Sequence, residues 1–178
     1  PGTDANEATF MHIADIALDA GDQAGNVKPR LYIAGQQNKV YRVQGGKLKL
    51  FAGGGAASMD DDNATFQDSL DVKLNEVVAI AAPYDSYRAA NDPLRPLLYI
   101  VDKNSADGGV NWKYRIHRVH QDGNATNEPA LEINTISGGG TLGYLTAAGQ
   151  ASAHLCDIPR IDDIAVDTLG RVYFGDNN

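Results

Sequence analysis

The stretch DIAVDTLGRVYFGD at residues 163–176 repeats a pattern that occurs twice earlier in the chain. The earlier copies are DIALD at 15–19 with LYIAG at 31–35, and AIAAP at 79–83 with LYIVD at 98–102. The central isoleucines Ile16, Ile80 and Ile164 are separated by 64 and 84 residues. A β-forming unit that recurs in this way is typical of repeat folds, in which each unit buries its apolar side chains against its neighbours.

Each unit is predicted to be a four-stranded antiparallel sheet, because short apolar or alternating runs are bounded by Gly, Pro, Asn and Asp. The first run, residues 13–18, is expected to be a buried strand, and Asp19 and Asp167 are expected to bond backbone N–H groups in the turns that follow the first strands. Glycine triplets at 53–55 and 138–140 mark the turn after the fourth strand. The expected strands are 13–18, 31–34, 40–43 and 47–51, then 77–82, 97–101, 114–119 and 131–136, then 164–167 and 171–174.

Four-stranded antiparallel units repeated head to tail predict an all-β fold, a β-propeller whose blades are these units. The third unit has only its first two strands, so we expect an incomplete ring that a longer chain or a partner chain completes. If a partner chain completes the ring, the edge at 171–174 is a template for strand pairing between chains and allows a homo-oligomer. The predicted division of 1–178 is a lead-in at 1–12, a first blade at 13–55, a connecting loop at 56–76, a second blade at 77–140, a connecting loop at 141–160 and half of a third blade at 161–178.

The overall charge narrows the range of partners. The 178 residues carry a formal net charge of −8, which disfavours nucleic acid and anionic membranes because both attract basic surfaces. No apolar run approaches the roughly 20 residues that a transmembrane helix requires. With 43% hydrophobic and 21% charged residues, the composition is that of a globular protein.

Cysteine content and glycosylation motifs bear on location. Cys156 is the only cysteine, so an intrachain disulfide is excluded and a small buried side chain is expected. Asn63 and Asn124 each begin an Asn-Ala-Thr triplet, which is either a plain polar loop or a glycosylation acceptor. Together with the acidity of the chain, these triplets favour an extracellular or cell-surface protein.

Three segments resemble the NHL-repeat family of six-bladed β-propellers. Residues 163–178 are similar to the family's sequence motif of two strands joined by a glycine turn. Residues 38–43 (NKVYRV) are similar to its third strand, and residues 51–55 (FAGGG) are similar to the turn that follows. Two positions depart from the family pattern. Pro83 replaces an acidic residue after the first strand of the second unit, and Gly35 stands where an aspartate follows the second strand of the first unit.

The resemblance implies several activities, because propellers host plain binding sites as well as lactonases and lyases. In a calcium-dependent lactonase, Asp102, Asn104 and Asp176 would be candidate Ca²⁺ ligands, since they follow second strands at equivalent blade ends. The alternative is that these residues cap exposed loops. Trp112 and Tyr114 either form an aromatic contact surface or pack beneath the loops.

The histidines and acids give little support for catalysis. His12, His117, His120 and His154 lack the spacing of a metal site, and we expect His117 and His120 on the surface. The sequence shows no Ser/His/Asp set and no pair of carboxylates placed for acid–base chemistry. We therefore expect a binding or assembly module that interacts with the remaining blades or with another protein chain. A calcium-dependent lactonase or related hydrolase is the alternative.

Overall fold

The protein is described by a computed structural model that covers residues 3–20, 29–59, 66–83, 96–105, 112–121, 131–138, 142–143, 153, 156–158 and 160–175. It is all-β, and the described residues include a short 3-10 helix, η1 (Gln36–Asn38), and no α-helix. The strands are β1 (Thr3–Asp4), β2 (Ile13–Asp19), β3 (Arg30–Gly35), β4 (Lys39–Gln44), β5 (Lys47–Ala52), β6 (Ala57–Ser58), β7 (Gln67–Asp68), β8 (Val72–Lys73), β9 (Val77–Ala81), β10 (Pro96–Ser105), β11 (Trp112–Gln121), β12 (Leu131–Gly138), β13 (Leu142–Gly143), β14 (Cys156–Asp157), β15 (Asp163–Val166) and β16 (Val172–Gly175).

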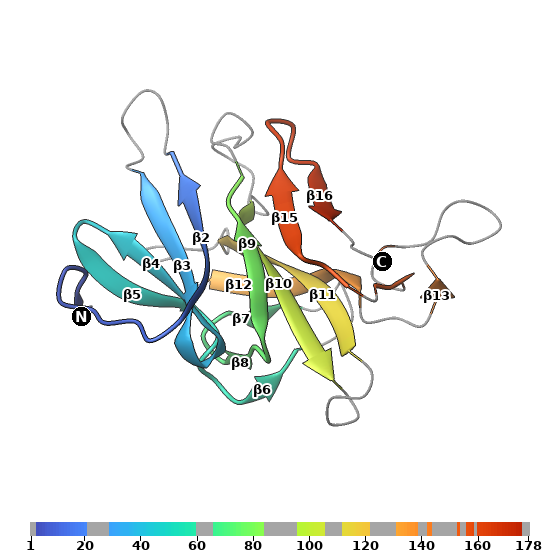
Figure 1. Ribbon diagram of the computed structural model, residues 1–178, viewed down its shortest axis with the longest axis horizontal. Coiled ribbons are helices and arrows are strands. Elements are labelled where there is room, and N and C mark those ends of the chain that lie inside the picture. The colour runs from blue at the N-terminus through green and yellow to red at the C-terminus, as the bar shows by residue number, and fades with distance from the viewer. Residues whose placement is uncertain are drawn as a thin grey trace.

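Two five-stranded antiparallel sheets make up most of the fold (Figure 1). The first has the order β1-β5-β4-β3-β2, the second has the order β7-β12-β11-β10-β9, and β15 pairs with β16. The all-β class and the four successive strands predicted for each of the first two units are confirmed. A fifth strand completes each outer edge: β1 comes from the lead-in, and β7 comes from the segment predicted as a connecting loop. Both strands have only two residues, too few to show a periodic pattern.

The first strands of the three units lie side by side, with β9 between β2 and β15 (Figure 1). Asp15 in β2 links two of them, because its Oδ2 accepts a hydrogen bond of 2.8 Å from the N–H of Ile80 in β9. The sheets therefore follow one another in chain order. Within the ranges that the structure describes, the strands form no closed ring.

The three units share one register. Side chains directly opposite each other on neighbouring strands point to the same face of a sheet, so these pairs define two faces in each unit. On one face an alanine lies opposite a tyrosine, in the pairs Ala17–Tyr32, Ala81–Tyr99 and Ala165–Tyr173. On the other face an isoleucine lies opposite an isoleucine or phenylalanine, in the pairs Ile16–Ile33, Ile80–Ile100 and Ile164–Phe174. We name these the alanine–tyrosine face and the isoleucine face.

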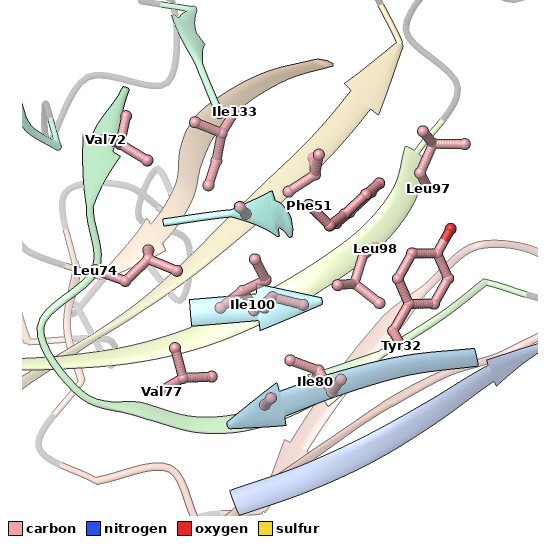
Figure 2. Close-up of a cluster of buried hydrophobic side chains, with 14 of the residues drawn as sticks. Tyr32, Phe51, Val72, Leu74, Val77, Ile80, Leu97, Leu98, Ile100 and Ile133 are labelled. Atoms are coloured by element: carbon pink, nitrogen blue, oxygen red, sulfur yellow. The ribbon is translucent and has the colours of Figure 1, made fainter. Parts of the chain in front are cut away.

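The alanine–tyrosine face of the first unit packs on the isoleucine face of the second (Figure 2). Tyr32 of β3 and Phe51 of β5 lie in the same buried cluster as Ile80 of β9. The rings of Tyr32 and Phe51 meet edge to face, with their centroids 4.8 Å apart. The segment that joins the two units adds Val72 and Leu74 to this cluster.

The same pairing of faces recurs between the second and third units. Ala81 and Tyr99 of the second unit share a buried cluster with Ile164 of β15. Cys156 and Ile158, from the segment that precedes the third unit, complete the cluster, and Cys156 is a buried free thiol as predicted. Each interface therefore combines the alanine–tyrosine face of one unit, the isoleucine face of the next, and the segment that joins them.

The isoleucine face of the first unit meets no preceding unit and is open at β2. Ile16 is 59% exposed, whereas its equivalents Ile80 and Ile164 are 3% and 6% exposed. The predicted burial of residues 13–18 is therefore wrong, because Ile16 and Leu18 point away from the second sheet and no described segment packs over them. The sequence pattern identified an apolar strand, but burial depends on a neighbouring sheet.

The alanine–tyrosine face shows the opposite trend along the chain. Tyr32 and Tyr99 are 0% and 5% exposed, because each is covered by the unit that follows. Tyr173 is 51% exposed, and its cross-strand neighbour Ala165 is exposed as well. The first unit therefore exposes its isoleucine face, and the third unit exposes its alanine–tyrosine face. These are the two faces that pack together at each internal interface.

The predicted glycine turn at 53–55 is confirmed, and Gly138, the first residue of the second triplet, is the last residue of β12. Gly53 and Gly138 have positive φ angles of 76° and 83°, which side chains of L-residues rarely adopt. A Cβ atom on Gly138 would lie 2.0 Å from the carbonyl oxygen of Tyr114, so no side chain fits there. Gly139 and Gly140 lie outside the described residues.

We predict that one substitution, isoleucine to alanine, has unequal costs at the three equivalent positions. Ile80→Ala and Ile164→Ala should each lower the free energy of unfolding by about 2–5 kcal/mol, because each leaves a cavity between two units. Ile16→Ala should lower it by less than about 0.5 kcal/mol, because this side chain is exposed. Urea unfolding followed by circular dichroism measures the change in unfolding free energy for each variant. Similar changes at the three positions would contradict the finding that a preceding unit covers Ile80 and Ile164 but not Ile16.

Candidate functional site

A row of buried polar side chains crosses the isoleucine face of the second sheet, and it includes the predicted site residue Asp102. Asp102 lies in β10, His117 in β11 and Thr135 in β12, and all three are fully buried. His117 is the cross-strand neighbour of both Ile100 and Thr135, which fixes the face. Polar groups at this depth are almost always hydrogen-bonded, so their contacts identify their role.

The carboxylate of Asp102 holds the segment that enters the second unit. Its Oδ1 accepts hydrogen bonds from the backbone N–H groups of Asn75 and Glu76, at 2.8 and 2.9 Å. Its Oδ2 accepts a third from Nδ2 of Asn75, at 3.1 Å. Hydrogen bonds to an ionised acceptor are stronger than neutral ones, and three converge on this side chain. Asp102 is therefore a buried anchor for the linking segment and does not cap an exposed loop.

The same segment is also held from the first sheet. Asn38, at the end of η1, donates a hydrogen bond from its Nδ2 to the backbone carbonyl oxygen of Asn75. The N–H of Lys103 donates to the carbonyl oxygen of Glu76 at 2.9 Å, and its Nζ lies 3.3 Å from the Glu76 carboxylate. Asn75 is thereby bonded to both sheets. Asp102 contributes to the fixed position of the second unit relative to the first.

The same three side chains also lie in the order expected of a catalytic triad. Thr135 would be the nucleophile, His117 the base and Asp102 the acid that orients the base. His117 Nδ1 lies 3.1 Å from Thr135 Oγ1, but its Nε2 lies 3.7 Å from Asp102 Oδ2, which is longer than a hydrogen bond. The three side chains are fully buried, and both oxygens of Asp102 already accept N–H groups from the linking segment. This geometry fits a structural crosslink between strands, with Thr135 fully buried.

The predicted surface placement of His117 and His120 is wrong. Both side chains are fully buried, because β11 is the central strand of a sheet that is covered on both faces. His120 Nε2 lies 3.2 Å from Oε2 of Glu132 on the neighbouring strand. The sequence did contain a signal for this burial. Ile116 and Val119 place apolar residues on both faces of the same strand, which is typical of a strand buried on two sides.

The other predicted site residues are not gathered into one site. Asn104 lies near the end of β10 and is partly buried. Tyr114 belongs to the cluster shared with the third unit, and its N–H donates to the carbonyl oxygen of Ile158 at 3.2 Å, so it is a packing residue. Trp112 is the first residue of β11. The predicted residues that lie outside the described ranges are Asn63, Asn124, His154 and Asp176.

Gly35 occupies the position equivalent to Asp102 in the first unit, and the structure explains the difference. A Cβ atom on Gly35 would lie 3.1 Å from Cδ1 of Phe10, a residue of the segment that enters this unit. The Phe10 ring packs edge-on against Tyr41, with centroids 5.6 Å apart. The entry to the first unit is therefore held by apolar packing, whereas the entry to the second is held by the carboxylate of Asp102.

Asp167 closes the turn between β15 and β16, as predicted. Its Oδ1 accepts hydrogen bonds of 2.9 Å from the N–H groups of Leu169 and Arg171, and its Oδ2 accepts one of 2.6 Å from Arg171 Nε. Desolvation acts to raise the pKa of Asp167, but the hydrogen bonds from Arg171 and Leu169 and the Arg171 charge hold this pKa below its ordinary value. Asp19, the equivalent residue of the first unit, is buried with its Oδ2 3.9 Å from Nη1 of Arg30.

The geometry of the described residues is the basis on which the function of this chain can be inferred. Among the described residues, no group of three or more His, Cys, Asp and Glu side chains is placed to hold a metal ion. The same part of the chain has no helix long and apolar enough to cross a membrane. The chain matches no protein-family profile, no curated protein and no solved structure. Its most informative features are the repeated faces of the three units and the anchor at Asp102.

We predict that Asp102→Ala lowers the free energy of unfolding by about 2–4 kcal/mol, because the N–H groups of Asn75 and Glu76 lose a buried acceptor. Asp68→Ala is the matched control, since Asp68 is exposed and accepts a single hydrogen bond from the N–H of Leu70. The control should cost less than about 1 kcal/mol in the same urea titration.

Calcium addition distinguishes an anchor at Asp102 from a calcium ligand at the same residue. Added calcium should leave the melting temperature of the unmodified chain unchanged, because Asp102 is already fully hydrogen-bonded. A rise in melting temperature with calcium that Asp102→Ala abolishes would contradict the assignment, since a ligand that binds only the folded state stabilises it.

Proposed function

We propose that this chain is a segment of an NHL-like β-propeller that serves as an extracellular module for protein interaction and assembly. The observation that carries the proposal is the common register of the three units. At both internal interfaces, the alanine–tyrosine face of one unit packs on the isoleucine face of the unit that follows. Adjacent first strands and face-to-face packing in chain order are the relations between successive blades of a propeller.

The exposed apolar side chains support a role in assembly. Ile16 and Leu18 lie on the open face of the first unit, and Tyr173 lies on the open face of the third. Apolar side chains gathered on one exposed face of a soluble protein mark an interaction surface. Inside this chain, the equivalent side chains lie in the contacts between units, so their chemistry suits another sheet better than a small polar ligand.

An extracellular location is supported by sequence features alone. The net charge of −8 and the Asn-Ala-Thr triplets at Asn63 and Asn124 fit a secreted or cell-surface protein. A calcium-dependent lactonase or related hydrolase is the weaker candidate function. Its proposed ligand Asp102 is buried and uses both carboxylate oxygens to hold the linking segment.

The interaction proposal predicts that the folded chain binds the apolar dye bis-ANS at the open isoleucine face. At a protein concentration too low for self-association, dye fluorescence should rise with the unmodified chain and fall severalfold with Ile16→Arg, because the charge replaces an exposed apolar contact. Leu70→Arg is the control, since Leu70 is 41% exposed in the segment that joins the first two units. Equal dye binding by the unmodified chain and Ile16→Arg would contradict an accessible surface at this face.

A further inference from the structure

We infer that this chain assembles head to tail, with the alanine–tyrosine face of the third unit in one copy docked on the isoleucine face of the first unit in a second copy. This inference rests on the proposed function, because it names the partner of the interaction module. It commits to a second copy as the occupant. The argument comes from the two internal interfaces, in which the same two faces are already joined.

The internal interfaces show that the two faces are complementary. Tyr32 of the first unit shares a buried cluster with Ile80 of the second. Tyr99 of the second unit shares a buried cluster with Ile164 of the third. The pairing is the same both times, and each copy of the chain exposes one face of each kind. A contact between copies therefore repeats an interface that the chain forms twice within itself.

The open isoleucine face of the first unit extends across four strands. Successive cross-strand pairs place Ile16, Ile33, Tyr41 and Leu50 in one row from β2 to β5. Ile16 and Leu50, at the two ends of this row, are exposed, whereas Ile33 is buried and Tyr41 is half-buried. Phe10 packs over Gly35 and against Tyr41, so it covers only part of the face.

The corresponding row in the second unit shows what such a face does when it is covered. Ile80, Ile100, His117 and Thr135 form this row from β9 to β12, by the same succession of cross-strand pairs. All four are buried. The row in the first unit is more apolar than its covered counterpart, since Tyr41 and Leu50 stand where the second unit has His117 and Thr135. Leaving its exposed members, Ile16 and Leu50, in water forfeits about 25 cal/mol for each Å² of apolar surface that a neighbour would bury.

The open face of the third unit carries the same alanine–tyrosine pair that the internal interfaces use. Ala165 is exposed at the position where Ala17 and Ala81 contribute to the internal contacts. Tyr173 lies opposite Ala165 and is also exposed. Gly175, the last residue of β16, has open space where a Cβ atom would lie. Small residues beside one tyrosine permit the close approach of a neighbouring sheet.

The contact is heterologous, because it joins two different faces. Such contacts form closed rings when the rotation between copies permits closure and open filaments when it does not. Electrostatics oppose the association, since each copy carries a net charge of −8. Added salt screens this repulsion and should therefore strengthen the assembly.

Two variants, each of which blocks one face, test the inference by complementation. Ile16→Arg blocks the isoleucine face and Ala165→Arg blocks the alanine–tyrosine face, with the same added charge. Both side chains are exposed, so neither substitution disturbs an internal contact. Leu70→Arg carries the matched charge away from both faces. Analytical ultracentrifugation over a concentration series measures assembly, and near-ultraviolet circular dichroism confirms that each variant is folded.

We expect the unmodified chain and Leu70→Arg to self-associate with increasing concentration. Each blocking variant alone should associate at least about tenfold more weakly. An equimolar mixture of the two blocking variants should form a dimer and nothing larger, because one open face of each kind remains.

Three results would overturn the inference. An unmodified chain that stays monomeric over its soluble concentration range would exclude a second copy as the partner. If that monomer still binds bis-ANS in the Ile16-dependent manner, the proposed function stands and only the identity of the partner is wrong. A blocked variant that associates as well as the unmodified chain, or a mixture that stays monomeric, would exclude the pairing of these two faces.

Discussion

Each sheet of this protein has two apolar faces, and this constraint governs the rest of the structure. A single sheet of this kind leaves one or both faces in water unless a neighbour covers them. Burying one isoleucine side chain contributes about 1.5–3 kcal/mol, so the rows of apolar residues dominate the contact between units. The alternation of alanine–tyrosine and isoleucine faces makes every contact directional, and the middle unit is the one whose faces are both covered.

Apolar packing brings the faces together, and the joining segments fix how the units sit. Asp102 performs this task for the second unit through three hydrogen bonds to Asn75 and Glu76. Phe10 performs it for the first unit by filling the space above Gly35. Asp102 and Gly35 occupy equivalent positions in the two units. The glycine departs from the repeat because Phe10 packs where a side chain would lie. Neither solution requires a metal ion.

The repeat made the order and type of the longer strands predictable, because each strand carries its own periodic signal of apolar residues. The shared turn glycines and the role of Asp167 were also readable from local chemistry. Burial was less predictable, since it depends on which face meets another sheet. Ile16 was expected to be buried and is exposed, whereas His117 was expected at the surface and is buried. The anchor role of Asp102 was missed because its partners Asn75 and Glu76 are 26 or more residues away in the sequence.

The central claim is that equivalent isoleucines contact the aromatic residues of the preceding unit wherever a preceding unit is present. Nuclear Overhauser effects from isoleucine methyl groups to tyrosine ring protons test it directly in solution. The account predicts contacts from the methyl groups of Ile80 to Tyr32 and from those of Ile164 to Tyr99. At a concentration where the chain is monomeric, Ile16 should show no contact to Tyr173. Absence of the Ile80 and Ile164 contacts in the folded chain would contradict the account.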